Sequence, residues 1–128
     1  MLIIRSAQLQ ALEDRQLEQA ALDRAPRFFP ELCRGLGKEL GPTIRKAVRK
    51  ARGYGFAAQS DALQFVYLAL LFGGDFDQDP NLPWAQRVLS DKDPAHRPFR
   101  ASRLYESALR HLRAEERRAA RGRQEKTR

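Results

Sequence analysis

The stretch Leu63-Gln-Phe-Val-Tyr-Leu-Ala-Leu-Leu-Phe72 decides the fold, because it is an apolar run with almost no polar break. A run of this length is compatible with a buried strand or a buried helix. Ser60 and Asp61 stand just before it and are typical of a helix N-terminus. Its Leu and Ala content and its helical neighbours also favour a helix. We therefore predict a central helix, buried on most sides, with Leu68 and Leu71 deep in the core.

The segment before this run predicts an amphipathic helix that begins at Gly41-Pro42. Its apolar residues are spaced to share one face: Ile44, Ala47, Val48 and Ala51. The opposite arc is basic and contains no acid: Arg45, Lys46, Arg49, Lys50 and Arg52. Gly53 and Gly55 mark the end of the helix, where Tyr54 and Phe56 are expected to offer aromatic surface.

The flanking segments also follow helical periodicity. Ser6 is a candidate cap for a first helix that Ala25-Pro26 should end or bend. The apolar positions of this helix are Leu9, Leu12, Leu17, Ala20 and Ala21. Pro30 and Pro83 suit the first turns of two short helices. The last helix has its apolar arc at Ala101, Leu104, Tyr105, Ala108, Leu109 and Leu112.

These segments predict the fold class. We find no internal repeat and no strand pair, so we expect an all-α protein. The architecture should be an irregular single-domain helical bundle of about five or six helices around the central buried helix. The domain should cover residues 1–113, and the charged segment 114–128 should form a frayed C-terminal tail.

Composition limits the class of protein. The chain has 128 residues and a formal net charge of +8, which suits one core rather than two. Its single cysteine, Cys33, excludes an internal disulfide and suits a reducing compartment. No apolar run approaches the ~20 residues of a membrane span, and the first residues do not have the pattern of a secretion signal. We expect a small, basic, soluble and cytoplasmic protein.

An acidic loop follows the central helix and invites comparison with a calcium-binding loop. Its acids stand at alternate positions: Asp75, Asp77 and Asp79. An EF-hand requires a glycine where this chain has Pro80, and a bidentate glutamate where it has Gln86. We therefore interpret the loop as a rigid turn, with aspartates capping local backbone N–H groups and Phe76 in the core.

No other residues form a catalytic or metal-binding pattern. His96 and His111 have no cysteine or carboxylate at zinc-ligand spacing. Cys33 has no evident base to activate it, and Gly73-Gly74 has no strand–loop–helix context for a phosphate loop. We expect a protein that is not an enzyme and uses no metal or cofactor.

Basic residues are concentrated toward the C-terminus, where residues 97–128 carry eleven Lys or Arg and four Asp or Glu. Such a surface can neutralise nucleic-acid phosphates. The basic helix, however, has no Asn, Gln or Ser among its cations to read bases. Nucleic acid is therefore the less favoured partner. Arginine is enriched at protein-binding hot spots, which favours a protein partner.

An ordered set of motifs resembles a known family. The set comprises Phe-Pro-Glu-Leu-Cys33, the segment from Ile44 through Arg-Lys-Ala-Arg-Gly-Tyr-Gly55, Gly73-Gly-Asp-Phe-Asp77, and Asp79-Pro-Asn-Leu-Pro-Trp-Ala85. It resembles small helical proteins that are encoded in type VI secretion gene clusters of Gram-negative bacteria. The similarity covers roughly residues 5–112, and its most specific segment is Asp79 to Trp84.

The resemblance implies an accessory protein or co-chaperone in effector loading. Its partner would be an adaptor chaperone, an effector or a spike-tip protein from the same gene cluster. An immunity protein to a secreted toxin, or a small nucleic-acid-binding protein, is the alternative. We place the partner-binding patch at Arg45, Arg49 and Arg52, with four aromatic anchors: Tyr54, Phe56, Phe76 and Trp84. The competing interpretation of Phe56, Phe76 and Trp84 is plain core packing.

Overall fold

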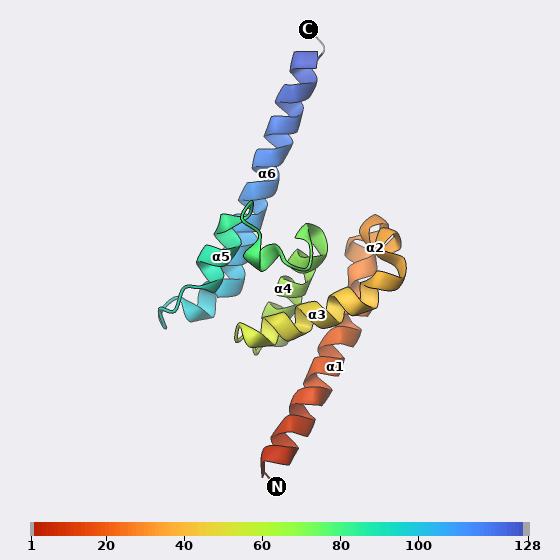
Figure 1. Ribbon diagram of the computed structural model, residues 1–128, viewed down its shortest axis with the longest axis vertical. Helices are drawn as coiled ribbons and strands as arrows, with labels where there is room; N and C mark the ends of the chain where they lie inside the picture. The colour runs from red at the N-terminus through yellow and green to blue at the C-terminus, as the bar shows by residue number, and fades with distance from the viewer. Residues whose placement is uncertain (1, 127–128) are drawn as a thin grey trace.

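The computed structural model describes the backbone of residues 2–126 and the side chains of residues 7–124 (Figure 1). Within this range the chain forms α-helices and short 3-10 helices (η) and no strand. Their order is α1 Leu2–Phe28, α2 Pro30–Leu36, η1 Gly37–Glu39, α3 Leu40–Gly53, α4 Gln59–Phe72, η2 Phe76–Gln78, α5 Pro83–Leu89, η3 Arg97–Phe99 and α6 Arg100–Lys126. The predicted all-α single-domain bundle is confirmed.

Helix α4 is the centre of the fold and packs against α1, α3 and α6. Its buried residues are Ala62, Leu63, Phe65, Val66, Leu68, Ala69 and Leu70. The prediction for Leu68 is confirmed, but the prediction that Leu71 is deeply buried is wrong, because its side chain is 40% exposed. Leu71 lies on the same helical face as Gln64 and Tyr67, which are only partly buried. The helix is thus buried on most sides and open along this one.

Helix α3 packs on α4 through the face that the sequence predicts. Ile44, Ala47, Val48 and Ala51 are all buried. Beyond the end of α3, Phe56 enters the core and packs against Phe65 of α4, with ring centroids 5.8 Å apart. Burial of these side chains removes them from water and so supplies the main stabilisation of the α3–α4 pair.

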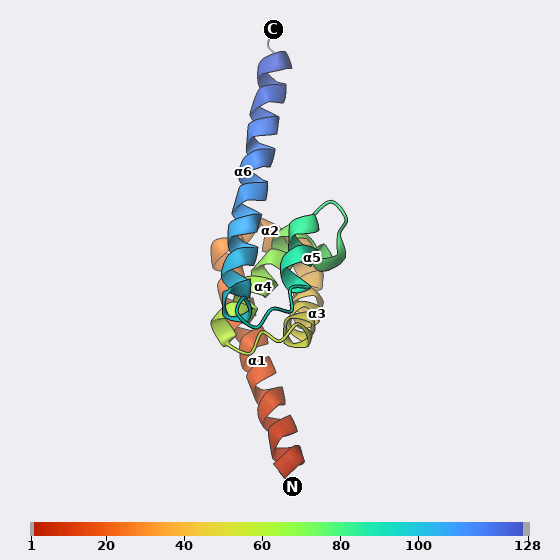
Figure 2. The ribbon, with the colours of Figure 1, turned by 90° about the vertical axis from the view of Figure 1, so that its left-hand side faces the viewer.

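Helix α1 is longer than predicted at both ends. It begins at Leu2, so Ser6 lies inside the helix and does not cap it. It also runs through Pro26 to Phe28, because a proline this close to the last turn interrupts little of the backbone ladder. Leu9 and Leu12 are exposed although they belong to the predicted apolar arc. The first half of α1 projects beyond the other helices, which explains their exposure (Figures 1 and 2).

The starts of the shorter helices agree in part with the sequence. Pro30 and Pro83 occupy the first turns of α2 and α5, as predicted. Ser60 is not the cap of α4, because Ala58 is at the N-cap position and makes no side-chain cap bond. None of the described helices is long and apolar enough to cross a membrane.

Helix α6 packs into the bundle only through its first part, where Ala101, Leu104 and Ala108 are buried. Its second part projects away from the core, toward the end of the molecule opposite to the start of α1 (Figure 2). The sequence favours a frayed tail from residue 114, whereas α6 continues as a helix to Lys126. Alanine, glutamate and arginine are strong helix formers, which accounts for the difference. Residues 127–128 lie outside the described part of the chain.

Candidate functional site

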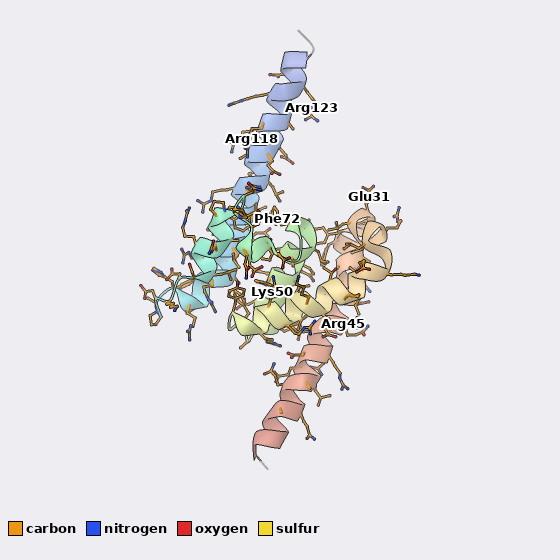
Figure 3. All side chains as sticks on the ribbon, viewed as in Figure 1. Glu31, Arg45, Lys50, Phe72, Arg118 and Arg123 are labelled. Carbon is orange, nitrogen blue, oxygen red and sulfur yellow. The ribbon has the colours of Figure 1, made fainter. Side chains whose placement is uncertain are left out.

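The basic face of α3 divides into three groups with different surroundings. Arg45 and Arg49 are exposed on adjacent turns, and neither forms a hydrogen bond or an ion pair within the described structure. Figure 3 labels Arg45 on α3. Lys46 and Lys50 lie toward the acidic loop, and Arg52 lies toward α1. Only the first group is free to meet a partner without breaking an internal contact.

Arg52, which the sequence also places in the partner-binding patch, joins α1 to the end of α3. Its Nε donates to Asp14 Oδ1 of α1 at 2.9 Å. Its Nη1 donates to the carbonyl oxygens of Phe56 and Ala57 at 2.8 and 2.7 Å. Both carbonyls lie in the loop between α3 and α4, so these charge-assisted bonds hold that loop against the end of α3. Arg52 is thus held inside the structure, unlike Arg45 and Arg49.

The acidic loop is held to α3 by a cluster of four charged side chains: Lys46, Lys50, Asp75 and Asp77. Lys50 Nζ donates to Gly74 O at 2.9 Å and to one carboxylate oxygen each of Asp75 and Asp77 at 2.8 Å. Lys46 Nζ donates to Asp75 Oδ1 at 3.0 Å. The carboxylates of Asp75 and Asp77, which the sequence analysis compares with a calcium-binding loop, are therefore paired with lysine ammonium groups.

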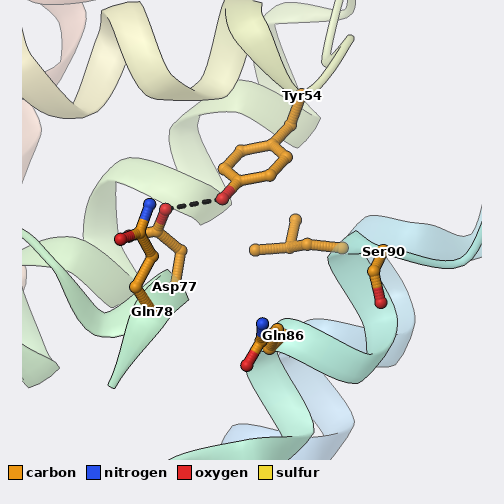
Figure 4. A pocket seen from close by; sticks show the side chains of 6 residues that line it. Tyr54, Asp77, Gln78, Gln86 and Ser90 are labelled. Atoms are coloured by element: carbon orange, nitrogen blue, oxygen red, sulfur yellow. Dashed lines mark hydrogen bonds between the residues drawn. The ribbon is translucent and has the colours of Figure 1, made fainter. Parts of the chain in front are cut away.

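Asp77 is the least exposed member of this cluster, with 2% of its surface accessible. Its second oxygen, Oδ2, accepts a bond from the Tyr54 hydroxyl at 2.6 Å (Figure 4). A buried carboxylate is tolerated only when its oxygens are paired, and Lys50 and Tyr54 supply those pairs. The expected turn geometry is also present, because the backbone N–H of Asn81 donates to Asp79 Oδ1 at 2.9 Å.

The cluster shifts the pKa values of its members in directions that its geometry explains. Burial, followed by the bond to Asp77, raises the pKa of Tyr54 to about 12. Hydrogen bonds from Lys50 and Lys46 lower the pKa of Asp75 to about 2. Partial burial alone would lower the pKa of Lys50, but its bonds to Asp75 and Asp77 outweigh that effect and raise it. Lys50 and Asp75 thus stay charged, and Tyr54 stays neutral, over the ordinary pH range.

A pocket of about 370 Å³ opens beside this cluster, lined by Tyr54, Asp77, Gln78, Gln86, Leu89 and Ser90 (Figure 4). The Tyr54 hydroxyl donates a hydrogen bond to Asp77 Oδ2, and Asp77 Oδ1 accepts one from Lys50 Nζ. These bonds connect Lys50 of α3 and Tyr54 at its end to Asp77 of η2. The cluster is therefore a structural link between α3 and η2.

The predicted aromatic anchors lie mainly in the core. Phe56 and Phe76 are buried, and Phe76 packs against Phe65 with centroids 5.0 Å apart. The expectation that Phe56 offers aromatic surface is wrong, whereas the core interpretation of Phe76 is confirmed. Trp84 is half-buried and packs edge-on against Phe72 at 5.5 Å. The four predicted aromatics therefore contribute packing, with Tyr54 adding the bond to Asp77.

A buried arginine escaped the sequence analysis. Arg100 Nη2 donates to Tyr54 O at 2.6 Å, and its guanidinium lies 4.8 Å from the centroid of the Phe56 ring. Burial lowers the pKa of Arg100. In the sequence, Gly55 is the feature that points to this turn. A Cβ at this position would lie 3.3 Å from Arg100 Nη2, and the glycine has a φ of +89°. This turn thus requires glycine for both its conformation and its close approach.

The remaining candidate residues also have structural surroundings. Cys33 is buried, and burial raises the pKa of its thiol, which disfavours a reactive thiolate. His96 is exposed and its Nδ1 lies 2.7 Å from Asp91 Oδ2. His111 packs near Trp84 and Phe72, and its Nε2 lies 3.0 Å from Glu115 Oε1. The described residues contain no cluster of three or more metal-ligating side chains.

Comparison with known proteins gave no match to a family model, a curated protein or a solved structure.

Proposed function

We propose that this protein is a non-enzymatic binding protein that acts as an accessory factor or co-chaperone for a type VI secretion effector or its adaptor chaperone. The observation that carries this proposal is the exposed pair Arg45 and Arg49, which has no partner within the described structure. Like charges four positions apart on a helix repel by about 0.2–0.5 kcal/mol. An acidic surface on a partner would offset that repulsion, so this pair is the proposed docking site.

The backbone beneath the pair supports a rigid docking surface. Ile44 and Val48 anchor α3 in the core. Lys50 fixes one side of the helix to the acidic loop, and Arg52 fixes the other side to Asp14 of α1. A surface that is already ordered loses little backbone entropy on binding, which favours affinity. The two arginines are thus exposed side chains on a helix whose backbone is held in place.

The secretion setting rests on the motif resemblance, and the binding role rests on the residues themselves. Within the described structure, the buried or partly buried polar groups of the α3–loop cluster are engaged with one another. This engagement supports a structural role for them and leaves surface recognition as the function to test. The partners to test are the adaptor chaperone, effector and spike-tip protein of the same gene cluster.

The test reverses charge at both arginines. We expect the Arg45→Glu/Arg49→Glu variant to lose at least tenfold in affinity for one of these purified partners, since truncating a true anchor costs about 2 kcal/mol or more. The matched control is Arg121→Glu, an exposed arginine on the projecting part of α6. Its affinity should match that of the unmodified protein. Both variants should keep the helical circular-dichroism spectrum and melting temperature.

Three other outcomes would count against the proposal, and the last two of them would each establish an alternative. Unchanged binding of a purified partner by the double variant would refute the docking site. Neutralisation of a toxin without any binding to adaptor or spike-tip protein would establish the immunity role instead. Retention of duplex in mobility shifts, with affinity falling steeply as salt rises and no protein partner bound, would establish the nucleic-acid role.

A further inference from the structure

Arginines from two helices surround a small pocket between α5 and α6. Arg87 comes from α5, and Arg103 and Arg110 come from α6, where Ser107 lies between them on the same face. The pocket has a volume of about 180 Å³ and is also lined by Trp84, Val88 and Glu106. The two helices pack against each other, so the cations are held on a fixed frame.

The charge balance of this pocket is positive. Arg87 and Arg110 are exposed and have no hydrogen bond or ion pair within the described structure. Arg103 donates one Nη1–H to Asp91 Oδ2 at 2.7 Å, but a guanidinium group has several N–H donors and retains others. Glu106 is the acid in the lining. The repulsion among the guanidinium groups would therefore be relieved by a bound anion.

We propose that this arginine pocket binds a single phosphate-type oxyanion. Guanidinium groups match the geometry of phosphate oxygens through paired N–H bonds, and the Ser107 hydroxyl adds a further donor. Trp84 also lines the pocket, and its buried Nε1–H has no acceptor within the described structure. Pockets for drug-sized ligands measure about 300–1,000 Å³. The smaller volume here suits one anionic group without a large attached body.

Asp91 acts on this pocket through Arg103 as a positioning residue. Its Oδ2 accepts a hydrogen bond from Arg103 Nη1 at 2.7 Å and also lies 2.7 Å from His96 Nδ1.

The inference does not depend on the proposed function, because none of the residues that line this pocket belongs to the Arg45–Arg49 pair on α3. Failure of either proposal therefore leaves the other standing.

The chain offers a direct reporter, because Trp84 is its single tryptophan and lines the pocket. The experiment follows the one indole N–H cross-peak in ¹⁵N-correlated NMR spectra. Inorganic phosphate and phosphoserine are titrated separately at an ionic strength held constant with sodium chloride. We expect a saturable shift with phosphate in the millimolar range or tighter. A shift with phosphoserine as well identifies a phosphomonoester as an accepted source, and a shift with inorganic phosphate alone identifies the free anion.

The variants test the assignment to the pocket. Arg87→Gln and Arg110→Gln should each weaken phosphate binding about tenfold, the loss of about 1.4 kcal/mol. The matched control, Arg121→Gln, should leave it unchanged. The substituted side chains are exposed and have no hydrogen bond or ion pair among the residues that the structure describes, so the backbone cross-peaks should show an intact fold. The absence of a saturable shift, an equal shift with acetate or chloride, or full phosphate binding by the Arg87→Gln/Arg110→Gln variant would overturn the proposal.

Discussion

Replacement of Asp77 by alanine should destabilise the fold strongly, because this buried carboxylate joins the acidic loop to α3. The change removes the acceptor for Lys50 Nζ at 2.8 Å and for the Tyr54 hydroxyl at 2.6 Å. Hydrogen bonds to a charged group contribute about 1.5–3 kcal/mol each. Two such bonds give an upper range of about 3–6 kcal/mol.

The expected loss lies near the lower end of that range. Lys50 is 21% exposed and keeps its bonds to Asp75 and Gly74 after the substitution. Its ammonium group is therefore still partnered, unlike the isolated charge that makes a broken buried pair most costly. We expect Asp77→Ala to lower the free energy of unfolding by about 3 kcal/mol. In a chain of this length that loss lowers the melting temperature by about 10 °C.

Urea denaturation followed by circular dichroism measures this loss, and two further variants make the measurement specific. The matched control is Asp75→Ala, because Asp75 pairs with the same lysine but is 75% exposed, and exposed ion pairs contribute little to stability. Tyr54→Phe should cost about 1.5–3 kcal/mol, because it removes one of these two bonds to the charged carboxylate. The variant with both Asp77→Ala and Tyr54→Phe should cost less than the sum of the two, since they share one bond. A loss below about 0.5 kcal/mol for Asp77→Ala, or an equal loss for Asp75→Ala, would refute the reasoning.

Three other predictions follow from burial and charge. Leu68→Ala should cost about 2–5 kcal/mol in urea denaturation, whereas Leu71→Ala should cost less than half as much because its side chain is 40% exposed; equal losses would contradict the burial pattern. The pKa of Tyr54 is raised to about 12, so its contribution is complete below pH 10 and is lost as pH rises toward 12; Tyr54→Phe should therefore flatten the alkaline limb of the stability curve. The pKa of Asp75 is lowered to about 2, so its contribution is present above pH 4 and is lost as pH falls toward 2; acid denaturation of Asp75→Asn should lack that loss, and an unchanged acid limb would argue against the lysine contacts.

Periodicity was sufficient to predict which segments are helical and which helix is central. The apolar spacing of Ile44, Val48 and their neighbours places them in the core, where the structure has them. The burial error in the central helix, Leu71, arises because a nearly continuous apolar run does not identify the open side of the helix. That side is set by which helices pack against α4, and this information is not local in sequence.

Helix ends were predicted less well, because local capping signals compete with the rest of the chain. Ser6 and Ser60 are good caps by residue type, yet both lie within helices. The projecting part of α6 follows from helix propensity, because it is rich in alanine, glutamate and arginine. Arg117 Nε and Arg118 Nε also donate to backbone carbonyls one turn back, at 3.4 and 3.5 Å. Propensity alone therefore accounts for this part of α6 better than the loss of its apolar stripe does.

The candidate site was predictable only where it depends on one helix. The exposure of Arg45 and Arg49 follows from the periodicity of α3. The burial of Asp77 does not, because its partner Lys50 lies 27 positions earlier in the chain. The same limit applies to the arginine pocket, whose cations come from both α5 and α6.

On the basic face of α3, cations that pair with acids of the same chain must be distinguished from cations that do not before a binding function is inferred. Its five cations are equivalent in the sequence, but Asp14 engages Arg52, and Asp75 and Asp77 engage the two lysines. Reversal of charge at those three positions would break internal contacts and lower stability, so a loss of binding there would be ambiguous. Reversal at Arg45 and Arg49 breaks no hydrogen bond or ion pair within the described structure, so a loss of binding there reports on recognition itself.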